Sequence, residues 1–568
     1  MTQQKPFAGR PVIYQIFTRL FTNNTPDPVP DGDLARNGAG KMNDITPAVL
    51  RSIKELGITH VWYTGVVEHA QATDYSAYGI RPDNPYVVKG KAGSPYAIKD
   101  YYDIDPDLAV SVPERMAEFE ALVARTHRAG LKVITDFVPN HVARQYHSDA
   151  APAGVRDLGE GDNPDVFFTR DNNFYYIPRQ KFAPQFYIDG YDEMPAKCTG
   201  NDCFTAFPGR NDWYETVKLN YGYDPGDGSR HYDPVPRTWH DMLAIMMFWA
   251  SKGIDGLRCD MVHMVPVEFW HWAIPQVKAR YPHLVFIAEI YDVSLYRSYL
   301  EWGGFDYLYD KVTLYDTLRG IQTANVSAAQ LTSAWQTVDG LSAKMLSFLE
   351  NHDEQRYASR QYMGNPYTVL PALVAIATMN NGAVMIYMAQ ELGEDAPDAE
   401  GFSGSDGRTT IFDYWSLDRL RRWLNGGRPS MKNLSEGERN LRETYASVLR
   451  LVNAEPALRE GSFFDVTYAN YNNPGFDPHR HFAYLRHCGD DLVLVVLNFA
   501  GHDADIAVNI PSHAFECLGL APERDAHGTD LLTGAFYAGP LTDSEPVRLH
   551  VDANGAAMVK FGKNGHTA

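Results

Sequence analysis

An arginine and an aspartate stand two residues apart at the end of an apolar stretch, in Gly256-Leu-Arg-Cys-Asp260. Residues two apart on a short buried strand face the same side, so Arg258 and Asp260 are expected to share one face. A neighbouring guanidinium stabilises an ionised carboxylate and lowers its pKa, which suits a nucleophile. An isolated Arg-x-Asp is more often a structural ion pair. Three further polar clusters favour the chemical interpretation.

These clusters each follow another apolar run. They are Asp136-Phe-Val-Pro-Asn140-His141, Glu289 after Val-Phe-Ile-Ala, and Asn351-His352-Asp353. Two carboxyls that flank a bond can hydrolyse an acetal, because one attacks the anomeric carbon while the other, kept protonated, donates to the leaving oxygen. Asp260 suits the first role. Glu289 suits the second, since the apolar run before it would desolvate it and raise its pKa. A single buried histidine is more often a satisfied core residue, but four clusters that end four strands indicate one site.

Eight apolar, strand-like runs alternate with amphipathic helices. The predicted strands cover residues 12–18, 58–64, 131–138, 256–261, 284–290, 305–309, 345–350 and 383–388. Near-continuously apolar strands separated by helices predict an α/β protein with a parallel sheet, and eight of them predict a closed (β/α)8 TIM barrel rather than an open doubly wound sheet. Such a barrel carries its chemistry at the carboxyl ends of its strands, which is where the polar clusters fall.

Two segments interrupt this alternation. Residues 142–240 are rich in Pro, Gly, Asn, Asp and Tyr and are too long for an ordinary loop, which predicts an inserted domain after the third strand. From 461 to 568 the pattern changes to short alternating runs, which predicts a C-terminal antiparallel β-sandwich. Its expected strands are 463–468, 481–486, 491–498, 505–510 and 547–561. The barrel would then consist of residues 1–141 and 241–460.

Composition narrows the partners and the compartment. Lys and Arg number 51 against 71 Asp and Glu, and this formal charge of −20 disfavours nucleic acid and anionic membrane surfaces. No run of about 18 apolar residues could span a bilayer, and the first residues lack the apolar core of a signal peptide. We therefore expect a cytoplasmic protein, with export of a trimmed form left open. Cys198 and Cys203 are close enough for a disulfide, but without a leader we expect free thiols.

The motifs resemble those of the α-amylase family of retaining α-glucosidases and glucanotransferases. Asp136-Phe-Val-Pro-Asn-His, Gly256-Leu-Arg-Cys-Asp, Ile287-Ala-Glu-Ile and Phe348-Leu-Glu-Asn-His-Asp are similar to its four ordered motifs, over about residues 10–460. The resemblance implies that Asp260 is the nucleophile and Glu289 the acid/base. It implies that Asp353 binds the 2- and 3-hydroxyls of the reacting glucose. It implies no cofactor for the chemistry.

The resemblance also implies the sugar contacts. Arg258 would orient the nucleophile, and His141 and His352 would bind hydroxyls of the reacting glucose. Tyr96, in Pro95-Tyr-Ala-Ile-Lys-Asp-Tyr-Tyr, is similar to the tyrosine that stacks beneath that sugar. The substrate partner would be a small oligosaccharide.

One position departs from the family pattern, and one expected metal site is left undecided by the sequence. His263 and Met264 stand where many members carry Lys-His, whose side chains reach the leaving-group sugar, and they offer fewer hydrogen-bond donors there. The resemblance also implies a structural calcium ion, held by the first-motif asparagine, an acid or amide of the inserted domain and a backbone carbonyl near the second motif. Asn140 and Asn220 could supply two ligands, but oxygen ligands are common in so polar a loop, so calcium binding stays open.

The sequence therefore predicts a retaining glycosidase that acts on α-glucosidic bonds of maltooligosaccharides or related α-glucosides through a glucosyl-enzyme on Asp260. One alternative is a glucanotransferase of the same mechanism, in which a sugar hydroxyl replaces water. The other is a non-catalytic barrel, against which the intact Asp260, Glu289 and Asp353 argue. Because Met264 offers a soft apolar surface, we expect short soluble α-glucosides to be preferred over raw starch, with some transfer to sugar acceptors.

Overall fold

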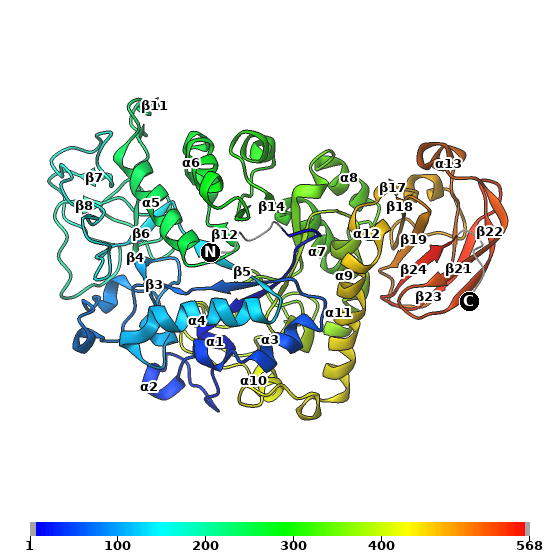
Figure 1. The fold of residues 1–568 in the computed structure, drawn as a ribbon, viewed down its shortest axis with the longest axis horizontal. Coiled ribbons are helices and arrows are strands. Elements are labelled where there is room, and N and C mark those ends of the chain that lie inside the picture. Colours follow the sequence, from blue (N-terminus) through cyan, green and yellow to red (C-terminus); the bar gives the residue numbers. More distant parts are fainter. Residues whose placement is uncertain (1–6, 563–568) are drawn as a thin grey trace.

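The computed structural model describes residues 7–562, and a closed barrel of eight parallel strands lies at its centre (Figure 1). The strands are β1 (Val12–Phe17), β2 (His60–Thr64), β5 (Lys132–Phe137), β12 (Gly256–Cys259), β13 (Val285–Ala288), β14 (Tyr307–Tyr309), β15 (Met345–Phe348) and β16 (Ala383–Tyr387). They pair in this order, and β16 closes the barrel against β1, with Val12 opposite Val384. All eight predicted strands are confirmed, each slightly shorter than predicted.

Helices surround the barrel. They include α3 (Pro47–Lys54), α4 (Arg115–Arg128), α5 (Arg237–Ser251), α6 (Val267–Arg280), α7 (Asp316–Thr323), α8 (Gln330–Thr337), α9 (Leu370–Thr378) and α11 (Glu436–Ala454). Thr46 caps α3, since its hydroxyl accepts from the Val49 N–H. Helix α9 is buried along nearly its whole length, because β15 lies on one side and strands of the C-terminal domain on the other. This double burial explains why α9 is apolar all round.

The predicted insertion follows β5 and lies at the end of the molecule away from the C-terminal domain (Figure 1). It contains three short antiparallel pairs, formed by β6 (His141–Ala143) with β9 (Thr216–Lys218), β7 (Tyr176–Ile177) with β8 (Ala196–Lys197), and β10 (Tyr223–Asp224) with β11 (Ser229–Arg230). Tyr175, Ile177 and Phe182 belong to a small apolar core of this segment. The limits 142–240 stay a prediction.

The C-terminal domain is antiparallel, as predicted. One sheet has the order β17 (Ser462–Asp465), β18 (His481–Cys488), β19 (Asp491–Asn498), β24 (Ala556–Phe561), β21 (Glu523–Asp530) and β22 (Phe536–Leu541), and a second pairs β20 (Ala504–Val508) with β23 (Val547–Val551). The single strand expected over 547–561 is wrong, because a turn with Asn554 at φ +50° separates β23 from β24. Strands β21 and β22 were missed, and β21 offers no alternating apolar pattern because Glu523–Asp530 is almost entirely polar.

The sequence also predicted that no segment spans a membrane and that the cysteines are free thiols. No helix within residues 7–562 is long and apolar enough to cross a membrane. The five cysteines all lie in this range, and each is a free thiol, including Cys198 and Cys203.

Candidate active site

Arg258, on β12, is fully buried at the carboxyl end of the barrel strands and joins the predicted carboxyl pair. Its Nη1 lies 2.8 Å from Asp260 Oδ1, and its Nη2 lies 2.8 Å from Glu289 Oε2. Its Nε donates to the Tyr309 hydroxyl at 3.1 Å. One guanidinium therefore holds both carboxyls, and the prediction that Arg258 and Asp260 share a face is confirmed.

Glu289 follows β13 directly and has a hydrogen bond on each oxygen. Oε1 accepts from the Tyr291 hydroxyl at 2.6 Å, and Oε2 accepts from the Met261 backbone N–H at 2.9 Å. Met261 has φ +42°, a left-handed conformation that side chains with a Cβ rarely adopt. Backbone strain of this kind occurs where the surrounding structure fixes it, often at functional sites. The Glu289 carboxyl is thus held in one position between β12 and β13.

The pKa of Asp260 depends on its burial and on the charges beside it. Burial, followed by the neighbouring charge of Glu289, raises the pKa of Asp260 well above its ordinary value, and Arg258 lowers it only in part. The expectation of a lowered pKa for Asp260 is therefore wrong in its net direction, because loss of water and a second carboxyl outweigh the guanidinium. The raised pKa of Asp260 favours the retention of one proton in this cluster. The retaining mechanism needs one proton on such a pair, because the nucleophile must be ionised and the acid protonated.

His352 and Asp353 follow β15 and adjoin this pair. His352 Nε2 lies 3.0 Å from Asp353 Oδ2 and 2.6 Å from the Tyr96 hydroxyl. The Tyr96 and His352 rings stack with centroids 5.2 Å apart. Desolvation raises the pKa of Asp353, but the charge and hydrogen bond of His352 outweigh it and hold this pKa below its ordinary value. The Asp353 side chain is 39% exposed, so an ionised carboxylate faces any ligand that enters.

Asp136 supports these groups from beneath, a role that sequence reasoning did not assign. Its Oδ2 accepts from Trp62 Nε1 at 3.1 Å, and its Oδ1 lies 3.7 Å from Arg258 Nη1. The Tyr96 hydroxyl donates to Oδ1 at 3.4 Å. The position of Asp136 in the first motif could have marked it as a site residue. Its partners could not be predicted, because they come from three other segments of the chain.

His141 lies on β6, where the inserted segment meets the barrel. Its ring centroid is 5.1 Å from that of Trp213. Burial, then the charges of Lys218 and Lys89, lower the pKa of His141 to about 3, so its imidazole is neutral. Its Nδ1 accepts from Asn140 Nδ2 at 3.1 Å, so Nε2 carries the proton and can donate to a sugar hydroxyl.

A cavity of about 330 Å³ opens onto this cluster and brings together five predicted residues, Tyr96, His141, Asp260, Glu289 and Asp353. The rest of the lining was not predicted from the sequence. It consists of Lys89, Ser94, Trp213, Glu215, Thr216, Met261, Tyr291, Ile411 and Phe412. Most of these wall residues belong to loops and to the inserted segment, for which no strand-end pattern exists.

His263 does not line this cavity. It lines an adjoining hollow of about 520 Å³ between the inserted segment and the loops around α6, with Met264, Tyr223 and Tyr232. Its ring centroid is 6.4 Å from that of Tyr291, which lines the first cavity. Burial lowers the pKa of His263, which favours the neutral ring. His263 therefore stands between the two spaces.

The two expected calcium ligands have different surroundings. Asn140 Oδ1 accepts from Lys218 Nζ at 2.5 Å. Asn220 is engaged by backbone, since its Nδ2 donates to the Thr169 carbonyl at 2.9 Å and its Oδ1 accepts from the Gly222 N–H at 2.8 Å. Both amide oxygens thus already have donors from the protein.

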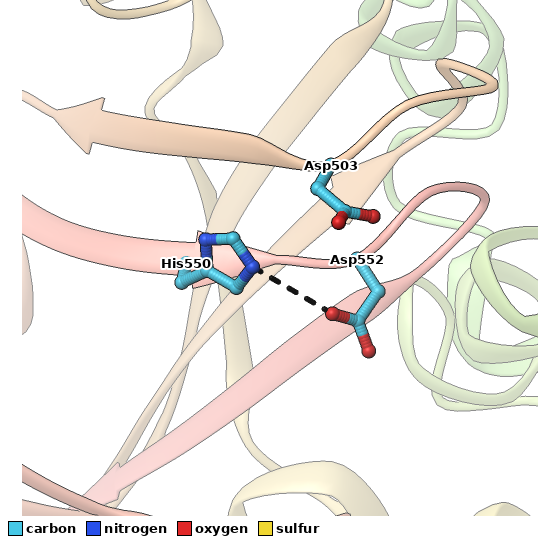
Figure 2. Close-up of side chains that lie close together, drawn as sticks. All are labelled: Asp503, His550 and Asp552. Carbon is cyan, nitrogen blue, oxygen red and sulfur yellow. Dashed lines mark ion pairs between the residues drawn. The ribbon is translucent and has the colours of Figure 1, made fainter.

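Other groups of potential metal-binding side chains lie away from these carboxyls. Within the described residues one is Asp503, His550 and Asp552 in the C-terminal domain (Figure 2), where His550 Nε2 lies 3.8 Å from Asp552 Oδ1. All three are exposed, and exposed acid and histidine side chains commonly pair without a metal. The other is the buried group of Glu68, Asp100 and Asp103. Burial, then the nearby acids, raise the pKa of Glu68 to about 9, which favours its neutral form.

The barrel and its carboxyl cluster define a glycoside hydrolase class, and the comparisons with known proteins agree. The family model "Alpha amylase, catalytic domain" matches residues 15–428, so the chain belongs to the α-amylase family. This confirms the predicted α-amylase-type enzyme acting on α-glucosidic bonds.

The relatives that cover most of this chain are distant from it in sequence. It is 22% identical to neopullulanase 2 of Thermoactinomyces vulgaris, over 94% of this chain and 77% of that protein. It is 24% identical to trehalose-6-phosphate hydrolase of Bacillus subtilis (strain 168), over 92% and 93% respectively. The crystal structure of an α-amylase from Geobacillus thermoleovorans, complexed with acarbose, matches with a TM-score of 0.62 and 19% identity, over 98% and 99%. This structural likeness confirms the fold.

Proposed function

We propose that this protein cleaves the α-glucosidic bonds of short soluble α-glucosides with retention, through a covalent glucosyl-enzyme on Asp260. The observation that carries the proposal is the contact of one buried guanidinium with both carboxyls, at 2.8 Å to Asp260 and 2.8 Å to Glu289. Two carboxyls held close together, with one proton retained in the cluster, suit the two-step retaining mechanism.

In the first step, an Asp260 oxygen attacks the anomeric carbon while Glu289 gives its proton to the glycosidic oxygen. The bond between that carbon and that oxygen breaks, and its electron pair stays with the departing hydroxyl. In the second step, ionised Glu289 takes a proton from water, whose oxygen attacks the same carbon and releases Asp260. The hydrogen bonds from Tyr291 and from the Met261 N–H would hold Glu289 in place for both transfers.

The remaining groups of the cavity would bind the reacting glucose. Ionised Asp353 accepts hydrogen bonds from two adjacent hydroxyls, and neutral His141 donates one from its Nε2. The Tyr96 ring, fixed by its hydroxyl contact with His352, offers an apolar face to the sugar ring. Asp353 also gives a negative charge close to the carbon that becomes positive in the transition state.

Features at the cavity wall support a short substrate. Lys89 Nζ lies 3.1 Å from Glu215 Oε1, and both side chains are largely buried in the lining. The same ammonium lies 5.8 Å from the centre of the Phe412 ring. A buried ion pair packed on an aromatic ring resists displacement, because each charge left alone would be costly. The wall therefore limits how many sugar units extend past the reacting glucose.

A transferase is the second candidate. The adjoining hollow beside His263 carries Met264, Tyr223 and Tyr232, which offer apolar and aromatic surface to a sugar that arrives as acceptor. An acceptor held there would compete with water in the second step.

Steady-state kinetics on maltose, maltotriose, maltoheptaose and soluble starch test the substrate proposal. We expect kcat/KM to be highest for the short oligosaccharides. Nuclear magnetic resonance of the first product should show the α-anomer, and chromatography at high substrate concentration should detect transfer products longer than the substrate. A β-anomeric product would contradict retention, and a preference for starch with random internal cleavage would contradict the short-substrate proposal. Trehalose, sucrose and an α-1,6-linked disaccharide in the same panel identify the bond.

A further inference from the structure

Lys218 brings a buried ammonium group to the junction between the inserted segment and the barrel. It is the last residue of β9, and it lies opposite His141 in the antiparallel pair that β9 forms with β6. Its side chain is only 8% exposed. Its Nζ lies 2.5 Å from Asn140 Oδ1, 2.7 Å from Asp202 Oδ1 and 3.1 Å from the Met264 carbonyl oxygen.

These three oxygens belong to three different segments. Asn140 follows barrel strand β5, Met264 belongs to the turn after β12, and Asp202 lies in the inserted segment. The Asn140 amide is oriented by its own Nδ2, which donates to the Gly200 carbonyl at 2.8 Å and leaves Oδ1 for the lysine. An ammonium group has three N–H donors and no acceptor, so three oxygens satisfy it completely.

The oxygens around Lys218 are of the kinds that the family resemblance implied for calcium: a first-motif asparagine, an acid of the inserted domain and a carbonyl near the second motif. Calcium takes about six to eight oxygen ligands at roughly 2.3–2.6 Å. Here the space between the three oxygens is filled by Nζ, and a second cation beside it would meet a like charge. The Asn220 amide, the other expected ligand, is engaged by backbone. The residues at this junction therefore do not fit a calcium ion.

We propose that the Lys218 ammonium is the structural cation of this junction and holds the inserted segment against the barrel without calcium. Because this cation is covalently part of the chain, neither dilution nor a chelator removes it. The pair β6 and β9 also carries His141 and Thr216, which line the active-site cavity, so Lys218 acts as a positioning residue for that wall. The proposal goes beyond the proposed function and does not depend on the substrate.

Thermal unfolding of the full chain tests this proposal without an activity measurement. For the wild-type protein we expect Tm values within about 1 °C in 5 mM EDTA and in 10 mM CaCl2, since no calcium binds the native state at the junction. For Lys218→Ala we expect a Tm lower by about 3 °C or more in EDTA, because three buried or half-buried oxygens lose their donor. Calcium should restore part of that loss by binding the vacated oxygens.

Lys197→Ala is the matched control. Lys197 is a lysine of the same segment, and its Nζ donates to the Arg144 carbonyl at 3.1 Å and lies 3.8 Å from Glu193. We expect this variant to lose stability without any gain from calcium. A calcium gain of equal size in Lys197→Ala, in the wild type and in Lys218→Ala would overturn the proposal, as would an unchanged Tm for Lys218→Ala in EDTA.

Asp202→Asn tests the junction if Lys218→Ala does not fold. We expect it to lower the Tm slightly, since Asp202 is 44% exposed, and to leave the wild-type insensitivity to calcium unchanged. Isothermal titration of the EDTA-treated wild type with CaCl2 completes the test. Stoichiometric calcium binding to the wild type that Asp202→Asn abolishes would assign the site to the metal and not to the lysine.

Discussion

Two buried cations, Arg258 and Lys218, each collect oxygen atoms from separate segments, but the charge around them differs. Arg258 has carboxylate oxygens of Asp260 and Glu289 at 2.8 Å and of Asp136 at 3.7 Å. Lys218 has one carboxylate and two neutral oxygens. Acids outnumber the cation at Arg258, so a proton is retained there, whereas the charges at Lys218 balance.

The difference separates a reactive site from a structural one. Burial, followed by the charge of Glu289, raises the pKa of Asp260 and favours retention of a proton in this cluster, which is what acid/base chemistry requires. At Lys218 one carboxylate pairs with one ammonium, so there is no second carboxyl to act as acid or base, and the cluster holds segments together. Variants that change the charge balance at Arg258 should therefore alter catalysis, and the corresponding changes at Lys218 should alter stability.

The largest effect is expected from removing either carboxyl of the pair. Asp260→Asn should lower kcat/KM by about 10⁴-fold or more, because the proposed nucleophile is lost. Glu289→Gln should lower it by about 10²–10⁴-fold, and less for an aryl glucoside whose leaving group needs no proton. Steady-state kinetics and circular dichroism together check these variants, which should keep the wild-type fold. Rates close to wild type in either would contradict the assigned roles.

Arg258→Lys should have the next largest effect. A lysine keeps the charge but cannot contact both carboxyls as the planar guanidinium does, so kcat should fall by about 10²-fold. Because Arg258 lowers the pKa of Asp260, weakening this contact should move the acidic limb of the kcat/KM profile to higher pH. A profile measured from pH 4 to 9 checks the direction, and an unmoved limb would show that Arg258 does not tune the pair. Arg442→Lys, at another buried arginine and carboxylate pair, is the control and should leave the profile unchanged.

Tyr291→Phe should produce a smaller loss. It removes the 2.6 Å hydrogen bond to Glu289 Oε1 while the Met261 N–H still holds Oε2. We expect kcat to fall by about tenfold, the value of one hydrogen bond to a charged group, with little change in KM. Tyr63→Phe, which removes a buried tyrosine hydroxyl that contacts Thr126 on α4, should leave kcat unchanged. A loss in KM alone would place Tyr291 in binding and not in holding the acid.

The smallest expected effect is on stability and depends on pH. A carboxyl whose pKa is raised by folding stabilises the folded state at low pH, and this contribution is lost as pH rises through the folded pKa. Asn does not titrate, so Asp260→Asn should gain Tm over the wild type as pH increases from 4 to 8, by about 1–3 °C. Calorimetry at both pH values checks this. A gain that is larger at pH 4 would reverse the sign that we assign to the pair.

The strand-end residues were the predictable part of the site. A buried parallel strand is nearly all apolar, so a charged residue at its end is conspicuous, and Arg258, Asp260, Glu289 and Asp353 were identified in this way. Closure of the barrel then requires those ends to meet at one rim. For these residues, the position at a strand end is visible in the sequence, and the closed barrel then brings the strand ends together.

The net pKa of Asp260, the cavity wall and the role of Lys218 depended on tertiary structure. Asp260 and Glu289 are 29 residues apart in the chain, so neither their proximity nor the depth of their burial can be obtained from either motif. Lys89 and Glu215 meet across more than a hundred residues of loop and insertion. Lys218 does not stand at the end of an apolar barrel strand, and its proposed role follows from the three oxygens that surround it in the fold. Sequence periodicity determines which face a side chain takes, but electrostatic energies depend on distance and solvent exclusion, which only the folded chain sets.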